Sequence, residues 1–164
     1  MSDFFARLST LCRKFSSKTV SARRETGEKF SIFQSELDGH PLIATIDMAL
    51  SAYKSKATLP WFLGLSAPLI RPTRDGLPTP SDSIALSEWE DLVEKLINPA
   101  CRFVYVGHVT WNGSREVLYY VDRVEPAATL LKKLGDDHVT RPFAFRCERD
   151  DVWENVSIYF RQLS

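Results

Sequence analysis

The sequence has few of the features that identify a protein's chemistry directly. It contains only three cysteines among 164 residues, Cys12, Cys101 and Cys147. An odd number of widely spaced cysteines is typical of reduced thiols and argues against a disulfide framework, so we expect a cytoplasmic protein. Zinc ligands usually occur in closely spaced pairs, and neither CxxC nor HxxxH is present. We therefore expect neither a metal nor a cofactor.

An excess of charge of one sign and long apolar runs are also lacking. The 21 Lys and Arg residues balance 21 Asp and Glu residues, so net charge gives no argument for a nucleic-acid partner. No run approaches the roughly 20 apolar residues that span a membrane. Charges at Asp3, Arg7 and Arg13 interrupt the N-terminus, unlike a signal peptide. Neither GxGxxG nor GxxxxGK[ST] occurs, so nucleotide chemistry and a small-molecule substrate are not expected.

The remaining composition is that of a globular chain. Apolar residues make up 44% and charged residues 26%, and the length suits one domain. Apolar residues at helical spacing predict an amphipathic helix over residues 3–16, and residues 7–24 contain six Lys or Arg and no acid. We therefore divide the chain into a basic N-terminal helix with its connector, residues 1–24, and a single α+β domain, residues 25–164.

Two tight turns predict hairpins. Asn112 and Gly113 readily take the positive φ angles of a type I′ turn, and strand-forming residues flank them within residues 103–122. Asp38 and Gly39 offer a similar turn within residues 30–50. These patterns predict antiparallel pairing.

The other patterns complete a recognisable order. Residues 59–70 are apolar almost throughout and predict a strand buried on both faces. Prolines and a glycine make residues 71–83 a loop, after which Ser83 or Ser87 is expected to cap a helix that ends at Asn98. A second helix is expected over residues 125–134 and a strand over residues 141–147, whereas residues 152–160 suit either a helix or a strand.

This strand, helix, hairpin, helix, strand order is the βαββαβ arrangement of a ferredoxin-like sandwich. We predict an α+β fold with an antiparallel sheet, extended at one edge by the N-terminal hairpin, with helices on one face.

Several short motifs in this order resemble a known family. They are Asp75-Gly76-Leu77-Pro78, Val106-Gly107-His108-Val109-Thr110, Gly113-Ser114-Arg115, Tyr119-Tyr120-Val121, and Asp151-Val152-Trp153 followed by Tyr159-Phe160. Together they resemble the bacterial domain-of-unknown-function 695 family over about residues 30–161. The resemblance implies a distant relation to ferredoxin-like inhibitors of ribonuclease E activity, and a kinship of role with toxin-neutralising immunity proteins. It therefore implies protein binding without catalysis.

Local chemistry supports catalysis weakly. The acidic cluster of Glu148, Asp150, Asp151 and Glu154 has the residue types for acid–base catalysis or a hard cation, but such charges in a loop are more often solvated or form a docking patch. The aromatic residues Tyr105, Trp111, Tyr119 and Tyr120 distantly resemble an RNA-binding sheet, without its basic glycine-aromatic signature.

We therefore predict a non-catalytic protein-binding module, an inhibitor or immunity-type partner that neutralises a bacterial toxin or nuclease by occlusion. The expected contact residues are those of exposed loops and of the hairpin tip: Arg74, Asp75, Leu77, Trp111, Arg115, Asp150, Asp151 and Glu154. The alternative is nucleic-acid or anionic-surface binding through the basic N-terminal segment.

Overall fold

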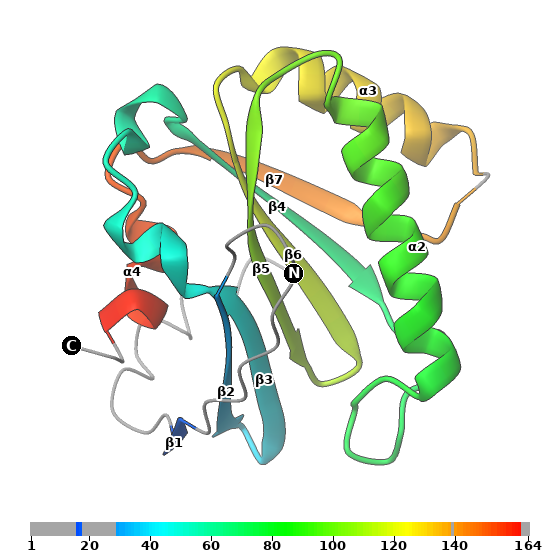
Figure 1. Ribbon diagram of the computed structural model, residues 1–164. Helices are drawn as coiled ribbons and strands as arrows, with labels where there is room; N and C mark the ends of the chain where they lie inside the picture. The colour runs from blue at the N-terminus through cyan, green and yellow to red at the C-terminus, as the bar shows by residue number, and fades with distance from the viewer. Residues whose placement is uncertain (1–15, 18–28, 139, 162–164) are drawn as a thin grey trace.

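The computed structural model describes residues 16–17, 29–138 and 140–161. Within these ranges one antiparallel sheet has the strand order β1-β2-β3-β5-β6-β4-β7 (Figure 1). Its strands are β1 (Ser16–Ser17), β2 (Phe30–Leu37), β3 (His40–Asp47), β4 (Trp61–Pro68), β5 (Phe103–Trp111), β6 (Ser114–Val121) and β7 (Ala144–Arg149). The helices are α2 (Pro80–Ile97), α3 (Val124–Asp136) and α4 (Glu154–Phe160), with 3₁₀ turns η1 (Met48–Ala52) and η2 (Lys56–Thr58).

The predicted ferredoxin-like sandwich is confirmed. Elements β4, α2, β5, β6, α3 and β7 follow one another along the chain, and their strands lie side by side in the order β7-β4-β6-β5. The β2–β3 hairpin pairs with β5 and so extends the sheet, as expected. Of the predicted N-terminal segment, only Ser16 and Ser17 are described, and they pair with β2; the predicted helix at residues 3–16 otherwise lies outside the described residues.

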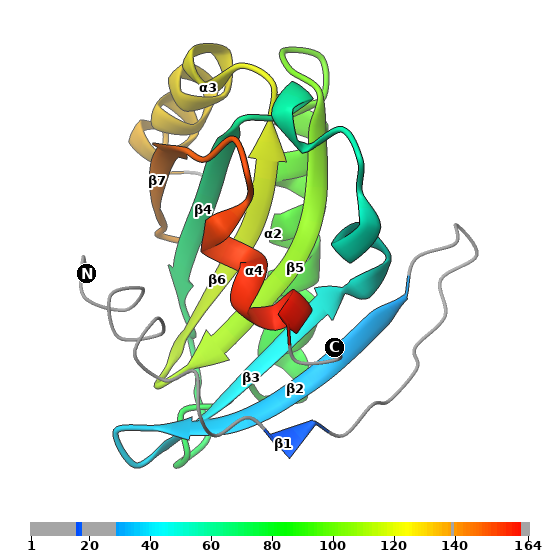
Figure 2. The same cartoon turned by 90° about the vertical axis from the view of Figure 1, so that its left-hand side faces the viewer.

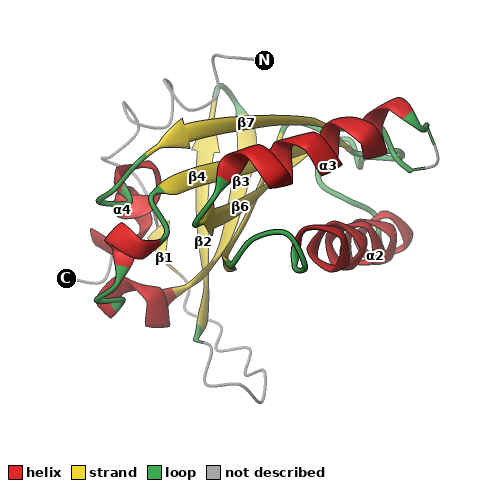
Figure 3. Cartoon of the chain, turned by 90° about the horizontal axis from the view of Figure 1, so that it is seen from above, coloured by secondary structure: helices red, strands yellow, loops and turns green. Residues whose placement is uncertain are grey.

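Helices cover both faces of this sheet (Figure 3). The two long helices α2 and α3 pack on one face against a core that includes Leu65, Leu86 and Val117. The short helix α4 lies across the opposite face, against a core that includes Phe33 and Leu118 (Figure 2). The expectation of helices on one face therefore holds for α2 and α3, and α4 adds a second covered face.

Two predicted elements begin at other residues than expected, and one ambiguous segment is resolved. Helix α2 begins at Pro80 with Thr79 as its N-cap, about one turn before Ser83 and two turns before Ser87, the predicted caps. The early start is possible because a proline is compatible with the first helical position. Strand β7 begins at Ala144, later than the strand predicted over residues 141–147, and ends at Arg149. Its side chains Phe145 and Cys147 still pack toward the α2–α3 core. The ambiguous residues 152–160 form α4.

Both predicted turns are present. Asn112 and Gly113 have φ angles of 44° and 78°, and Asp38 and Gly39 have φ angles of 53° and 76°. A bulge follows Tyr105 in β5, where the backbone of Gly107 comes so close to β3 that a Cβ would lie 2.0 Å from the Thr45 carbonyl oxygen. The bulge breaks the side-chain alternation and places His108 on the face covered by α2.

Candidate functional site

The proline-rich loop and the hairpin tip, two motifs of the family resemblance, lie against each other. The Gly113 N–H donates to the Gly76 carbonyl oxygen at 2.9 Å, and the Leu69 N–H donates to the Gly113 carbonyl oxygen at 2.8 Å. Gly76 has a φ of 74°, and a Cβ there would lie 2.9 Å from Asn112 Cα. The loop is thus fixed by backbone contacts while Arg74 and Asp75 remain exposed and Leu77 is half-buried.

The two side chains predicted as contacts at the hairpin tip, Trp111 and Arg115, form hydrogen bonds within the protein. Trp111 Nε1 donates to the Leu37 carbonyl oxygen at 2.9 Å, and its ring contacts His40 edge-on. Arg115 is 8% exposed, and its guanidinium donates to Thr110 Oγ1 at 3.1 Å and Glu90 Oε1 at 3.4 Å. The expectation that Arg115 is an exposed contact is wrong, because strand alternation turns it beneath α2.

The residues predicted as contacts in the acidic turn differ in their exposure. Asp150 is buried and accepts hydrogen bonds from Tyr120 Oη at 2.6 Å and from the backbone N–H groups of Glu154 and Asn155. Burial alone would raise the pKa of Asp150, but these hydrogen bonds outweigh it and hold the pKa below its ordinary value. Asp150 is therefore a structural cap of α4, contrary to the expected exposed role, and only Asp151 and Glu154 remain exposed.

The exposed members of the predicted set do not form one surface. The hairpin tip is paired to Pro68 at the end of β4, whereas Arg149, before the acidic turn, is paired to Trp61 at its beginning. Seven residues of strand separate these two ends, roughly 23 Å. The proline-rich loop and the acidic turn are therefore two separate areas, and a small contact surface would include only one of them.

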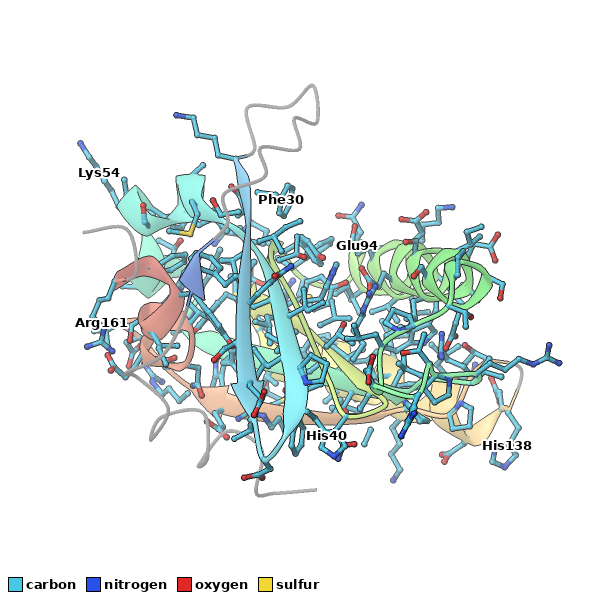
Figure 4. The ribbon with its side chains drawn as sticks, turned by 90° about the horizontal axis from the view of Figure 1, so that it is seen from below. Phe30, His40, Lys54, Glu94, His138 and Arg161 are labelled. Atoms are coloured by element: carbon cyan, nitrogen blue, oxygen red, sulfur yellow. The ribbon has the colours of Figure 1, made fainter. Side chains whose placement is uncertain are left out.

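A polar cluster that the sequence did not predict lies beneath α2. Glu90 of α2 pairs with Arg115, and its other oxygen lies 3.9 Å from His108 Nδ1. Tyr105 Oη is within 2.8 Å of the same His108 nitrogen. Burial raises the pKa of Glu90, and Arg115 offsets part of that effect. Phe30 and Glu94 lie on this same side of the sheet (Figure 4), and the ring of Phe30 contacts Tyr105.

A second polar cluster lies on the opposite face. Arg146 of β7 binds Glu116 at 3.3 Å through Nε and also pairs with Glu148 through Nη1. Burial raises the pKa of Glu116 to about 7, although Arg146 opposes that rise. The first network joins α2 to the sheet, and the second joins strands β6 and β7.

An exposed apolar area lies beside α2. Of the described residues, four large apolar side chains are exposed: Ile70 at 64%, Ile84 at 63%, Leu92 at 44% and Val152 at 69%. Ile70 and Leu92 line one hollow of about 270 Å³, and Ile84 precedes another lining residue in α2. The full lining is Ile70, Ala85, Glu88, Trp89, Leu92, Thr140 and Arg141. We call Ile70, Ile84, Leu92 and this hollow the α2 patch.

Arg141, which lines the hollow, is held by a buried ion pair with Asp82. Arg141 Nη2 donates to the Pro68 carbonyl oxygen at 2.6 Å and to Asp82 Oδ1 at 3.2 Å, and the two side chains are 5% and 2% exposed. Asp82 also accepts from the backbone N–H of Ile70 at 2.8 Å. Among the described residues, Arg141 Nε, Arg141 Nη1 and Trp89 Nε1 are buried without a hydrogen-bond partner.

All of these features lie within one family match. The model of a family of unknown function, DUF695, matches residues 28–164. The chain belongs to DUF695. The predicted membership of this family is therefore confirmed, and residues 1–27 lie outside the match. The distant relation to inhibitors of ribonuclease E activity stays a prediction. No curated protein and no solved structure gives a significant match to the chain.

No three His, Cys, Asp or Glu side chains in residues 29–138 and 140–161 gather closely enough to hold a metal ion. Burial raises the pKa of both Cys101 and Cys147, the latter to about 11, so neither is poised as a thiolate. No helix in the described ranges combines the length and apolarity needed to cross a membrane.

The α2 patch of this DUF695 chain was not predicted from the sequence, although one signal for it exists. Ile84 and Leu92 lie outside the buried stripe of Leu86, Trp89 and Val93, and apolar residues at such positions indicate an apolar outer face of the helix. Arg141 and Asp82 are 59 residues apart, and no local pattern links them.

Proposed function

We propose that this DUF695 chain is a non-catalytic protein-binding module whose contact surface is the α2 patch. In its finer form, the proposal is an inhibitor or immunity-type partner that neutralises a bacterial toxin or nuclease by covering its surface. The observation that carries the proposal is the gathering of three of the four exposed large apolar side chains, among the described residues, at one corner of the fold. Contiguous exposed apolar area on a folded domain is typical of a protein contact site.

The neighbouring loop supports the same surface. Residues 71–79 join Ile70 to α2 and carry the exposed Arg74 and Asp75. The Gly76–Gly113 backbone hydrogen bond fixes the loop before any partner binds. A contact surface that is already ordered loses little conformational entropy on association, which favours affinity. The loop residues predicted from the sequence therefore remain candidates at the rim of the α2 patch.

Charge narrows the chemistry of the partner. Glu88 lines the hollow, and Asp91 is exposed on the outer side of the same helix. These two carboxylates suit a partner whose apolar anchor is flanked by Lys or Arg, whereas the exposed Arg74 of the neighbouring loop suits an acidic group of the partner. Enzymes that act on nucleic acid carry such basic surfaces because they bind phosphates. A nuclease covered at its substrate-binding surface fits this chemistry.

The test compares two exposed apolar positions. A photo-crosslinking amino acid is placed at Ile84 or, as the matched control, at Val152, which is similarly exposed but lies before α4. The full chain is crosslinked in cells, and the protein captured from position 84 is purified. We expect it to bind the wild-type chain one to one, to lose at least about tenfold in affinity with Leu92→Asp, and to retain affinity with Val152→Asp.

Two results would reject the proposal. One is equal capture from positions 84 and 152, since the α2 patch would then have no preferred partner. The other is unchanged affinity of the captured protein for Leu92→Asp. If the partner is a nuclease, its activity should fall as the chain is added in equimolar amount and should recover with Leu92→Asp.

The second candidate is electrostatic binding through residues 7–24, which are described only at Ser16 and Ser17. The six basic and no acidic residues of this segment favour it. Affinity for single-stranded nucleic acid or anionic vesicles would then fall steeply with salt and disappear when residues 1–24 are deleted. Salt-tolerant binding through the α2 patch would distinguish the first candidate from this one.

A further inference from the structure

We propose that the α2 patch binds an amphipathic helix of the partner, which carries a Lys or Arg residue with an apolar residue one turn before it and another one turn after it. The inference rests on the proposed protein-binding function and names the kind of segment that the site accepts. The apolar residues would contact the patch at Ile70 and Leu92, and the basic residue would pair with Glu88.

The α2 side of the hollow extends over two turns of the helix. Four of the described lining residues belong to α2 at positions i, i+3, i+4 and i+7, namely Ala85, Glu88, Trp89 and Leu92. Residues at this spacing share one face of a helix, and the first and last lie about 10 Å apart along its axis. The hollow therefore presents a helical face, against which the side-chain ridges of a second helix can pack.

The backbone around the hollow favours a helix over an extended segment. An extended segment binds by pairing its backbone N–H and C=O groups with a strand edge. None of the described lining residues lies in a strand. Strand β4, which ends at Pro68 shortly before Ile70, is paired with β6 on one side and with β7 on the other. The Ile70 N–H donates to Asp82 Oδ2 at 2.8 Å. A helix needs no strand edge because its own backbone groups bond one another.

The charge of the lining favours a basic residue on the bound helix. Glu88 is exposed and lies between Ala85 and Leu92 along α2. Among the described lining residues the only cation is Arg141, whose buried side chain pairs with Asp82 at 3.2 Å. A Lys or Arg residue of the partner is therefore attracted to Glu88. Because apolar groups lie on either side of Glu88, the partner residues on either side of its cation are apolar too.

The size of the hollow indicates that side chains of a larger surface enter it. Its volume of about 270 Å³ lies just below the roughly 300–1,000 Å³ of sites that hold drug-sized molecules. The exposed Ile84 beside the hollow extends the contact along α2. Ile84, Glu88 and Leu92 are spaced four residues apart and so form one row on the outside of α2. The bound helix would cover this row.

The test uses a synthetic helix as the probe. It is a hydrocarbon-stapled peptide of about 16 residues, long enough to hold a helix, with Leu, Arg and Leu at successive turns of one face and Ala elsewhere. Binding to the full chain is followed by NMR through the methyl resonances of Ile70 and Leu92, with the exposed Val152 as the reference. We expect saturable shifts at Ile70 and Leu92 and none at Val152. Absence of saturable shifts would overturn the inference.

A proline variant of the peptide tests the helical form. Proline in place of a central alanine, on the face away from the Leu, Arg and Leu side chains, breaks the helix and keeps those three side chains. The proline peptide should bind at least about tenfold more weakly. Equal affinity of the two peptides would show that the patch does not require a helix.

A charge exchange tests the role of Glu88. Glu88→Lys should weaken binding of the arginine peptide at least about threefold, and a peptide with Glu in place of Arg should bind Glu88→Lys more tightly than the wild-type chain. Glu125→Lys, an exposed position on α3 outside the described lining, is the matched control and should change neither affinity. The same response of both variants would reject Glu88 as the partner of the basic residue.

The outcomes also separate this inference from the proposed function. If the protein captured from position 84 loses affinity with Leu92→Asp while the stapled peptide does not bind, the helix inference fails and the proposed function stands. If the peptide binds as expected while positions 84 and 152 capture proteins equally, the proposed function fails alone.

Discussion

Gly64 of β4 makes room for the carboxylate of Glu116 on β6. A Cβ at position 64 would lie 2.3 Å from Glu116 Oε1 and 2.9 Å from a ring carbon of Phe62. Arg146 binds the same Oε1 atom at 3.3 Å from β7. The buried ion pair thus depends on the missing side chain of a neighbouring strand.

We expect Gly64→Ala to lower the free energy of unfolding by about 1–3 kcal/mol, because the added methyl group displaces Glu116 or Phe62 in a filled core. Urea denaturation measures this change. Gly135→Ala is the control, since a Cβ there would lie 3.9 Å from Phe143 in ordinary contact. That helical substitution should be neutral or stabilising by up to about 1 kcal/mol. Equal stability of the two variants would contradict the crowding at Gly64.

Glu116 should also make stability depend on pH. Burial raises its pKa from 4.5 to about 7 in the folded protein, so the folded state holds this proton more tightly than the unfolded chain does. The resulting stabilisation is complete below about pH 4.5 and is lost as the pH rises through about 7. Between about pH 5 and pH 8, the wild-type chain should therefore lose roughly 2–3 kcal/mol of unfolding free energy relative to Glu116→Gln.

The control for this pH effect is Glu148→Gln, which removes the other carboxylate bound by Arg146 and whose side chain is 51% exposed. Most of the pH dependence should remain in that variant. Parallel stability profiles for the wild type and Glu116→Gln would show that Glu116 does not carry the effect.

The Asp82–Arg141 pair should be important for stability. Asp82→Asn leaves the Arg141 guanidinium buried without a counter-ion, and we expect a loss of about 3–5 kcal/mol in thermal or urea unfolding. The exposed pair of Arg161 and Glu154, with side chains 65% and 69% exposed, supplies the comparison. Glu154→Gln should change stability by less than about 1 kcal/mol. A similarly small effect of Asp82→Asn would mean that Arg141 is hydrated when its partner is removed.

Local signals were sufficient for the fold. The Asn112–Gly113 turn, the apolar β4 and the helical stripe of α2 each act within a few residues, and together they predict the βαββαβ order. The state of residues 152–160 was not predictable in this way, because their apolar pattern suits both a helix and a strand. Asp150 decides it by accepting from the first backbone N–H groups of α4, and the left-handed Trp153, stacked on Tyr120, starts the helix.

The contact residues were harder to predict because composition does not report orientation. Arginine is a residue type common in binding hot spots, yet Arg115 lies two residues before Val117 and four before Tyr119, both on the α2 side of β6. Strand alternation therefore places it on that face. The environment of Trp89 and Arg141 arises from segments 52 residues apart and depends on tertiary packing. Such a site becomes visible only when both segments are placed.

Strand β7 is the outermost described strand beyond β4, and three of its six side chains are the charged Arg146, Glu148 and Arg149. Open sheet edges invite strands from other molecules, and charged side chains oppose that pairing because it would bury them. The charged side chains of β7 thus oppose aggregation. They discourage the pairing of β7 with a strand of another copy of the chain at high protein concentration.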